Sequence, residues 1–461
     1  MLEAINEVLS GIFLPMLLLA AGLFYAVRLR FFHLFKFSTV LRVLTKKKEK
    51  GGVSSFRSLT LALAGTLGVG NIVGVASAIA LGGAGAVFWM WLSALAAMLL
   101  KFAEVLLGVR YRKREGDAWR GGAPYYIKEG LARRGVMKWG GGIASVFAFL
   151  CLLDSFTTGC SIQSAAVASA LDGVMGIPVA VSGILLASVC AFLLVRGMGG
   201  VMRVTAVLVP LMCGGFLFLS VWCMAIRPLE ILPALARIVR EAFSPVSAGS
   251  GVCGFLLSRA VRFGTMRGLL SNEAGCGTSP FAHAVADTCS PVEQGFWGIF
   301  EVFVDTVLLC TVTAIVILMN LDAVGAYFAD PMMMAIRAYS APFLGVWKGI
   351  VEGFLGVSIL CFGFATLLCW AQYGLACVDF LTRKANWRTL YVGAFSAAAF
   401  WGAVAAQKFL FEIADLVIGL MILLHVPILC LFSGEVYGET GKYFGWRKLS
   451  LTKGKKCDRI K

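Results

Sequence analysis

Residues 65–72 place three glycines and an asparagine inside an otherwise apolar segment, where they could bind a small polar solute or a cation. The stretch reads Gly-Thr-Leu-Gly-Val-Gly-Asn-Ile. Each glycine costs about 0.5–1 kcal/mol of helix stability relative to alanine. In hydrocarbon, an unpaired backbone N–H or C=O group costs several kcal/mol, so irregular backbone persists only where it lines a cavity or binds something. The sequence therefore predicts a broken helix with a binding site at membrane depth.

The composition is that of a membrane protein with several spans. Of 461 residues, 59% are hydrophobic and 14% are charged, and the mean hydropathy is +0.86. Soluble domains carry about 25% charged residues. Apolar runs near the ~20 residues that a bilayer requires predict about eleven spans. They are expected at roughly 10–30, 55–81, 84–109, 142–170, 177–197, 203–226, 248–270, 294–319, 343–377, 388–406 and 411–433.

Positive charge alternates along the loops between these spans. The net charge is +16, and basic residues gather in every second loop. This positive-inside pattern predicts an inner-membrane protein with its N-terminus outside and its C-terminus in the cytoplasm, and it argues against a nucleic-acid patch. The clusters are Arg28, Arg30, Lys36, Arg42, Lys46, Lys47, Lys48 and Lys50; Arg110, Arg112, Lys113 and Arg114; Arg383, Lys384 and Arg388; and Lys453, Lys455 and Lys456.

Neither the cysteines nor the N-terminus points to other chemistry. The 14 cysteines lie mostly in apolar segments, without a CxxC pair or a histidine cluster at metal-ligand spacing. We expect buried thiols and no cofactor apart from a coupling ion. No basic region precedes the first apolar run and no cleavage site follows it, so this run is expected to be an anchor.

The spans divide into two matching halves once the first is set aside. The remaining spans form two groups of five, at 51–226 and 248–433, and each group begins with a Gly-rich interrupted segment, at 55–81 and 248–282. Matching broken helices at corresponding positions are typical of inverted-repeat secondary transporters.

A packing role for these glycines is the alternative, since Gly70 and Gly74 also form a GxxxG face. The amphipathic stretch Pro233–Glu241 is expected at the membrane interface. The expected organisation is a single transmembrane domain over 1–461, with an extra helix and basic loop at 1–50 and a cytoplasmic tail at 434–461.

Four stretches resemble the family of alanine or glycine:cation symporters, over nearly the whole chain. They are Gly68–Ile79; Gly82–Trp91, running on to Lys101-Phe-Ala-Glu104; Gly121–Ile127; and Arg267–Pro280, with Ser-Asn-Glu-Ala-Gly at its centre. The resemblance implies an all-α fold of the leucine-transporter type, with a ten-helix five-plus-five core. It also implies symport of a small neutral amino acid, such as alanine or glycine, with Na⁺ or H⁺.

For such a zwitterion the broken segment offers suitable groups. The N–H groups of Gly68, Val69 and Gly70 can meet a carboxylate, while the carbonyl of Thr66 can meet an ammonium group. The resemblance adds Gln163, which the helix at 142–170 retains. Trp370, one turn from Thr366, could close the pocket or could instead be a core or interfacial residue. The expected substrate contacts are Thr66, Gly68, Val69, Gly70, Gln163, Gly251, Gly254 and Trp370.

A cation site is expected where the helix at 343–377 faces the first broken helix. The resemblance places Thr366 there, opposite the carbonyls of Ala64 and Leu67, and the amide oxygen of Asn71 could ligate Na⁺ beside the substrate. Family members commonly carry a threonine pair at this point, whereas this chain has Ala365 before Thr366. One hydroxyl oxygen is therefore lost from the site.

The helix at 142–170 departs from the family pattern in other ways. Family members usually show Gly-Asn-x-x-Gln-x-Asn, whereas this chain has Cys160 and Ala165 at the asparagine positions. A larger or less polar pocket is expected. Asp154 is a further departure, and a carboxylate near mid-bilayer costs about 2.5–3.5 kcal/mol. Asp154 either pairs near the cytoplasmic vestibule, or replaces lost sodium ligands, or titrates and couples transport to protons.

Other polar residues invite structural interpretations. Glu301 and Asp305 are four apart on one helix, and pairing with Arg262 or Arg267 is favoured over a proton relay.

The segment after residue 270 is expected to form a cytoplasmic-side structural or gating turn. Asn272 and Glu273 lie in it, and Gly275 and Gly277 end the helix. His283 is expected to be structural.

The sequence therefore predicts a secondary transporter that works by alternating access in the bilayer and requires no oligomer. Proton coupling is the main alternative within transport. A solute channel is the alternative from another class, but no filter-like motif supports it. No HExxH or GxSxG motif and no clustered nucleophile and base indicate an enzyme.

Overall fold

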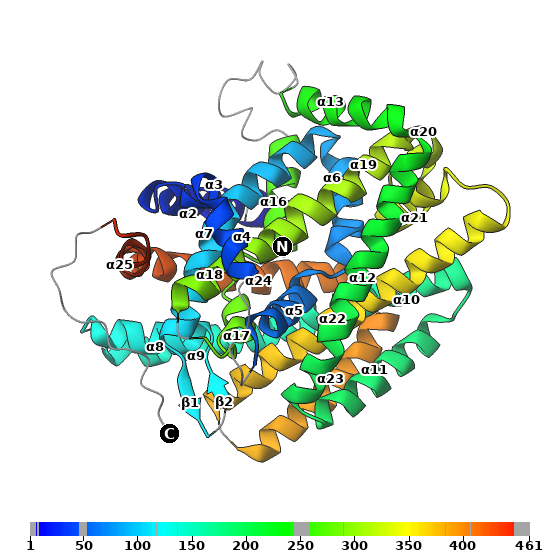
Figure 1. Cartoon of the computed structure of the whole chain (residues 1–461). Helices are drawn as coiled ribbons and strands as arrows, with labels where there is room; N and C mark the ends of the chain where they lie inside the picture. Colours follow the sequence, from blue (N-terminus) through cyan, green and yellow to red (C-terminus); the bar gives the residue numbers. More distant parts are fainter. Residues whose placement is uncertain are drawn as a thin grey trace.

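The protein is known from a computed structural model in which helices dominate (Figure 1). The described residues are 6, 9–45, 53–116, 118–135, 137–243, 259–288, 290–382, 384–405 and 407–446. Gly251 and Gly254, expected among the substrate contacts, lie outside these residues, as does most of the expected cytoplasmic tail.

The chain runs through these elements in order. The longer helices are α2 (Leu14–Arg28), α4 (Phe37–Leu44), α5 (Ser55–Thr66), α6 (Val73–Gly82), α7 (Gly85–Arg110), α8 (Ala123–Arg133), α9 (Met137–Phe156), α10 (Ile162–Met175), α11 (Val179–Val195), α12 (Met198–Ile226), α13 (Ile231–Ala242), α16 (Arg259–Asn272), α18 (Pro291–Val302), α19 (Cys310–Met319), α21 (Pro331–Ser340), α22 (Val346–Leu381), α23 (Ala385–Val404), α24 (Gln407–Leu431) and α25 (Ser433–Phe444). Short elements are α3 (Phe32–Phe35), α17 (Ser279–His283), α20 (Leu321–Val324), the 3₁₀ turns η2 (Val69–Asn71), η4 (Pro228–Glu230) and η6 (Gly325–Tyr327), and the π-helical segments η1 (Leu9–Phe13), η3 (Thr157–Ser161) and η5 (Phe303–Leu309).

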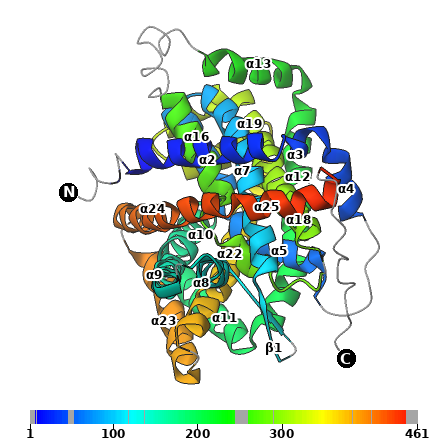
Figure 2. The same ribbon diagram turned by 90° about the vertical axis from the view of Figure 1, so that its left-hand side faces the viewer.

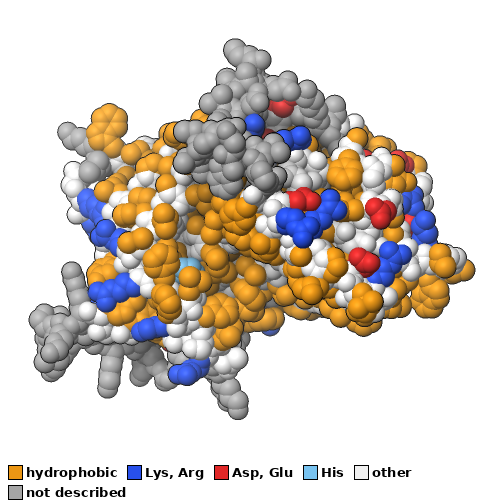
Figure 3. Space-filling view, turned by 90° about the horizontal axis from the view of Figure 1, so that it is seen from above, with side chains coloured by type: hydrophobic (Ala, Val, Ile, Leu, Met, Phe, Trp, Pro, Cys, Tyr) orange, Lys and Arg blue, Asp and Glu red, His pale blue; other side chains and the backbone are white. Residues whose placement is uncertain are grey.

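Several helices have the length and apolar character of membrane spans. Six qualify among the described residues: Gly85–Arg110, Trp139–Met175, Met198–Ile226, Pro291–Met319, Val346–Leu381 and Leu410–Leu431. Large apolar side chains of α12 (Val207, Leu211 and Phe218) are exposed, and Figure 3 shows a surface on which hydrophobic side chains are widespread and basic ones gather in patches. Such a surface fits a bilayer and confirms a multi-pass membrane protein. The count of eleven spans stays a prediction.

The first interruption lies where the glycines predicted it. Helix α5 ends at Thr66, and the N–H of Gly68 turns back to donate to the Thr66 carbonyl at 2.8 Å. The 3₁₀ turn η2 follows, and α6 begins at Val73. A short helix on each side of a non-helical turn is the geometry expected of a broken helix at membrane depth.

The second interruption begins after Asn272, the last residue of α16. The backbone then takes positive φ angles at Glu273 (53°), Gly275 (89°) and Gly277 (77°) before α17 starts at Ser279. Positive φ is readily adopted by glycine and disfavoured for glutamate, so Glu273 holds a strained conformation that its surroundings must stabilise. The expected end of the helix before the two glycines is confirmed.

The all-α prediction needs one small correction. Strands β1 (Lys113–Glu115) and β2 (Ala118–Arg120) form an antiparallel hairpin in which Lys113 pairs with Arg120. The connection between them contains Gly116, whose φ is +60°. A turn of this kind lets a short polar loop between helices pair with itself.

Helix α7 lies at the centre of the helical packing. It packs against α16 so closely that a Cβ at Gly264 would lie 2.2 Å from the Ala86 carbonyl oxygen, and one at Gly268 would lie 2.3 Å from Ser93 Oγ. Small residues allow this close approach of backbones in membrane proteins. Helix α2 packs against both α7 and α24 (Figure 2).

Candidate functional site

A cavity of about 720 Å³ joins the two interrupted helices. Its volume is in the range of small-molecule sites, and its wall mixes apolar side chains with a few polar ones. The wall includes Thr66, Gly68, Val69, Gly70 and Gly74 of the first interrupted helix; Gln163 and Ala165 of α10; Arg267 and Glu273 of the second interrupted helix; and Asp415 of α24.

The glycines of the first interruption have different surroundings. A Cβ at Gly68 would lie 2.9 Å from Gln163 Oε1 and 3.1 Å from Thr366 Oγ1, so only glycine fits there without a shift. Among the described residues, no atom lies within 4 Å of a Cβ built on Gly70 or Gly74, and both face the cavity. In the described structure these two positions line the cavity and contact no neighbouring helix, which favours a cavity role over the GxxxG packing face.

Gln163, expected to contact the substrate, contacts the interrupted backbone in the structure. Its Oε1 accepts the N–H of Val69 at 3.3 Å, and its Nε2 donates to the Thr158 carbonyl at 3.4 Å. Thr158 lies in the π-helical segment η3, where the helix widens beside the cavity. Gln163 therefore presents an amide at the wall and pairs with one of the three N–H groups that were expected to meet a carboxylate, that of Val69.

Glu273 is the residue that the sequence interpretation missed. It was expected in a cytoplasmic-side turn, yet it lines the cavity. Its Oε1 accepts the indole N–H of Trp370 at 3.1 Å, and its Oε2 accepts the Thr278 hydroxyl at 2.7 Å. A carboxylate beside glycines at membrane depth is a site signal in its own right, and that signal could have identified it.

Trp370 serves the cavity indirectly. The side chain is fully buried and packs on Gly159, where a Cβ would lie 2.3 Å from the indole. Within the described structure Trp370 is not part of the cavity wall, because Glu273 lies in front of it. The expectation that Trp370 closes the pocket is therefore corrected: it holds the carboxylate that faces the pocket.

Asn71 lies in a buried cluster of oxygen atoms behind the first interruption. Its Nδ2 donates to Asp305 Oδ1 at 2.8 Å and to Ser271 Oγ at 3.3 Å. Asp305 Oδ2 accepts the hydroxyls of Ser271 at 2.9 Å and Thr306 at 2.7 Å. Asn71 Oδ1 is buried and meets no hydrogen-bond donor in the described part of the chain. Hard cations such as Na⁺ prefer oxygen ligands of these types.

The second expected cation position has the predicted neighbours. The Thr366 hydroxyl lies 2.9 Å from the Ala64 carbonyl oxygen, and it also donates to the Phe362 carbonyl at 3.0 Å. Ala64, Leu67, Ala365 and Thr366 are all buried. The prediction that α22 faces α5 is therefore confirmed. Ala365, which lacks the second hydroxyl of the family pattern, is fully buried.

The two asparagine positions lost from the family pattern have separate surroundings. Ala165 lines the cavity, whereas Cys160 is buried against α23 and its thiol meets the Phe395 carbonyl at 3.4 Å. Only Ala165 thus changes the cavity wall directly.

Asp154 is buried on α9, at the start of the widened segment. Its Oδ1 accepts the Thr157 hydroxyl at 3.2 Å, and its Oδ2 meets no donor in the described structure. The side chain is fully buried, and Asp154 does not line the cavity.

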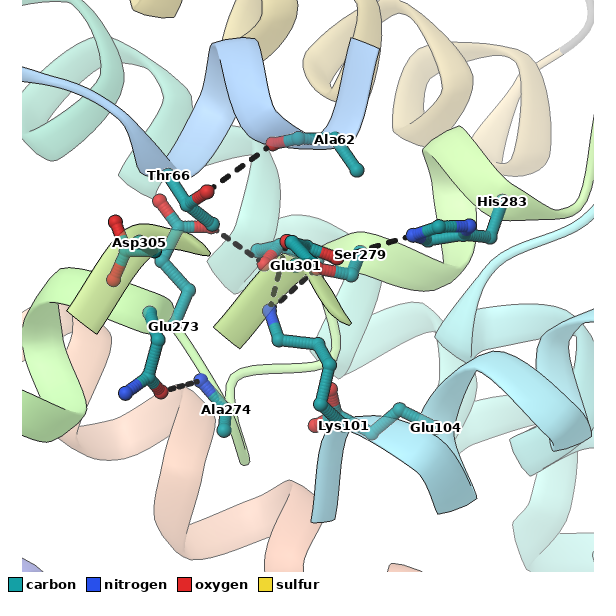
Figure 4. Close-up of polar contacts among 12 residues, drawn as sticks. Ala62, Thr66, Lys101, Glu104, Glu273, Ala274, Ser279, His283, Glu301 and Asp305 are labelled. Carbon is teal, nitrogen blue, oxygen red and sulfur yellow. Dashed lines mark hydrogen bonds and ion pairs between the residues drawn. The ribbon is translucent and has the colours of Figure 1, made fainter. Parts of the chain in front are cut away.

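Glu301 and Asp305 do not pair with arginines, so that expectation is wrong. Glu301 pairs with Lys101 Nζ at 3.4 Å and with His283 Nε2 at 3.0 Å, and all three side chains are fully buried (Figure 4). Arg267 instead lines the cavity, where it interacts with the opposite charge of Asp415. Lys101 lies on α7, so the spacing of acidic residues along α18 could not reveal it as the partner of Glu301.

Comparison with known proteins identifies the family of the chain. Residues 1–456 match the model of the sodium:alanine symporter family. The chain is 32% identical to the sodium/alanine symporter AgcS of Methanococcus maripaludis over 97% of this chain and 98% of that one. It is 32% identical to the amino-acid carrier protein AlsT of Bacillus subtilis, over 94% and 90% of the two chains.

A solved structure shares the fold. The crystal structure of MhsT in complex with L-phenylalanine is 14% identical, covers 87% of this chain and 94% of that one, and superposes with a TM-score of 0.56. At this identity the likeness shows the fold, and it confirms the leucine-transporter type that the family resemblance implied. The match over nearly the full length shows that the chain belongs to the sodium:alanine symporter family.

Proposed function

We propose that the protein carries a small neutral amino acid, such as alanine or glycine, together with Na⁺ across the inner membrane by alternating access. Sodium-coupled amino-acid symport is the activity of its family. The observation that carries the proposal is the cavity between the interrupted helices, with backbone N–H groups on one side and the carboxylate of Glu273 on the other. A zwitterion needs these two kinds of group at a short distance from each other.

The substrate would use both sides of the cavity. Its carboxylate would meet the N–H groups of Val69 and Gly70, at the positive end of the half-helix α6, whereas the N–H of Gly68 already donates to the Thr66 carbonyl. Gln163 would exchange its contact with Val69 for a contact with the substrate. The ammonium group would face Glu273 and the Thr66 carbonyl, and the side chain would take the space beside Gly70.

Two positions would hold Na⁺ next to the substrate. The first is the cluster of Asn71, Ser271 and Asp305, with the unpaired amide oxygen of Asn71. The second lies between Thr366 and the carbonyls of Ala64 and Leu67. The N-terminus would lie outside the cell, and the core would consist of two five-helix halves at 51–226 and 248–433.

Uptake into proteoliposomes tests this function. We expect saturable accumulation of radiolabelled alanine or glycine that depends on an imposed Na⁺ gradient. Glu273→Gln keeps the shape of the side chain but removes the charge that faces the ammonium group, and it should raise KM by about tenfold. A channel would equilibrate the solute without concentrating it. That outcome, or wild-type KM in Glu273→Gln, would contradict the proposal.

Proton coupling is a second candidate, and Asp154 favours it. This carboxyl group is fully buried and one of its oxygens meets no donor in the described structure, which suits a group that gains and loses a proton. Asp154→Asn should then abolish the dependence of uptake on a pH gradient while dependence on Na⁺ remains. Identical responses to both gradients in the variant and the wild type would exclude a role for Asp154 in coupling.

A further inference from the structure

The turn of the second interrupted helix is held by two charged residues of α7. Lys101 and Glu104 lie three residues apart and therefore on one face of the helix. Figure 4 shows both side chains extending from α7 toward the segment that contains Glu273 and Ser279. Both are fully buried. We call Lys101 and Glu104 the α7 clasp.

Glu104 binds the turn through its backbone. Its Oε1 accepts the N–H of Gly275 at 2.8 Å and the N–H of Gly277 at 3.1 Å. Both glycines have positive φ, and such turns direct their N–H groups into a concavity that suits an anion. The protein fills this anion position with a carboxylate of its own.

Lys101 binds the start of the next helix. Its Nζ lies 2.5 Å from Ser279 Oγ and 3.4 Å from Glu301 Oε1, and Ser279 Oγ itself donates to Glu301 Oε1 at 3.0 Å. His283 and Gln294 complete this group, with Gln294 Nε2 and His283 Nδ1 2.8 Å apart. The clasp therefore ties α7, the turn, α17 and α18 together.

Glu273 stands between α16 and the clasped segment. Its backbone has a positive φ, which a glutamate does not adopt without restraint from its neighbours. Its Oε2 is oriented by Thr278, the residue between Gly277 and Ser279, and both of those residues touch the clasp. Release of the clasp would thus free both the backbone and the side chain of Glu273.

We propose that Lys101 and Glu104 are positioning residues for substrate binding, because they fix the turn that directs the Glu273 carboxylate into the cavity. The inference rests on the proposed function, in which Glu273 faces the ammonium group. Neither clasp residue lines the cavity in the described structure, so their effect on the substrate passes through the turn.

Alkylation of Cys276 tests the clasp directly. Cys276 lies between the two glycines that Glu104 binds and is buried. Full-length protein in detergent would be treated with N-ethylmaleimide, and modification would be quantified for each cysteine peptide by mass spectrometry. Cys190, buried on α11 away from the clasp, serves as the internal reference.

Three variants carry the test. Glu104→Ala should raise the labelling rate of Cys276 and the KM for alanine by about tenfold each, with maximal velocity retained. Glu104→Gln keeps an acceptor oxygen without charge, so it should shift both quantities by about threefold. Ser220→Ala removes a buried hydroxyl that contacts Tyr339 and should behave as wild type.

The outcomes separate the inference from the proposed function. Faster labelling of Cys276 with slow labelling of Cys190 supports the clasp even if alanine proves not to be the substrate. Wild-type labelling and wild-type KM in a folded Glu104→Ala variant would overturn it. If Cys190 also becomes reactive in Glu104→Ala, the protein is misfolded and Glu104→Gln decides, because wild-type labelling of Cys276 in that variant would also overturn the inference.

Discussion

Both interrupted helices break at turns that contain glycine, but different side chains pair with the free N–H groups of the two turns. At the first interruption, the N–H of Val69 meets the neutral amide of Gln163, and Gly70 faces open space in the cavity. At the second, the N–H groups of Gly275 and Gly277 meet the buried carboxylate of Glu104. Both turns present N–H groups that suit an anion, but only the second has one supplied by the chain.

This difference indicates which half of the site changes during transport. A neutral amide is exchanged for a substrate carboxylate at little cost, because charge-assisted hydrogen bonds are roughly twice as strong as neutral ones. A buried ion pair such as Lys101–Glu301 resists change, since separating its partners leaves a charge without compensation. The first interruption is therefore suited to bind and release ligands, and the second to provide a fixed wall.

The largest expected effect comes from breaking the fixed wall. Lys101→Met leaves Glu301 buried without its cationic partner and should lower the free energy of unfolding by about 3–5 kcal/mol. Thermal unfolding of the purified protein measures the loss. The double variant Lys101→Met/Glu301→Gln removes the uncompensated charge of Glu301, although Glu104 still lacks the nearby lysine, and should recover part of the stability. Equal stability of wild type and Lys101→Met would show that the pair does not hold the second interruption.

A somewhat smaller effect is expected from crowding the first interruption, where the substrate would replace the contact of Gln163. Gly68→Ala places a Cβ 2.9 Å from Gln163 Oε1 and 3.1 Å from Thr366 Oγ1. Overpacking of this kind costs about 1–3 kcal/mol, so uptake should fall by about tenfold or more. Gly74→Ala is the matched control, because its Cβ meets no described atom within 4 Å. Similar uptake by the two variants would mean that the close contact at Gly68 is unimportant.

The cluster of Asn71, Ser271 and Asp305, which we propose to hold Na⁺, links the first interrupted helix to α16 and should respond at an intermediate level. Asp305→Asn keeps the size of the side chain and removes its charge, so the Na⁺ concentration for half-maximal uptake should rise by about tenfold. The control is Thr313→Val, which removes a buried hydroxyl of α19 that donates to the Leu309 carbonyl. Unchanged Na⁺ dependence in Asp305→Asn would remove this cluster from the coupling scheme.

The sequence predicted the helical architecture because its signals are local. Glycines mark the break at 65–72, and apolar runs mark the helices to within a few residues. The position of Thr366 opposite the Ala64 carbonyl was also anticipated, through the resemblance that places these two helices face to face. The contact of Gln163 with the break was not anticipated, because Gln163 was expected to contact the substrate.

The charged contacts were not predicted, because they depend on helix packing in three dimensions. Lys101 and Glu301 are 200 residues apart in the chain, and no spacing rule connects α7 with α18. Glu273 was assigned to a turn from its glycine neighbours, and only the positive φ of its own backbone brings the carboxylate to the cavity. The roles of Gly251 and Gly254, which belong to the segment at 248–282, remain sequence predictions.

The smallest effect is expected from adding an oxygen ligand for Na⁺ near the first interruption. Ala365→Thr would place a second hydroxyl beside Thr366, on a helix that faces the Ala64 carbonyl. One more oxygen ligand should strengthen Na⁺ binding and lower the Na⁺ concentration for half-maximal uptake by about threefold. Ala365 is fully buried, so Ala365→Val, which has the same shape without the oxygen, controls for crowding. The same shift in both variants would assign the effect to packing. A shift in Ala365→Thr alone would show that an added oxygen ligand strengthens Na⁺ binding at the first interruption. The second interruption needs no such ligand, because contacts within the chain hold it.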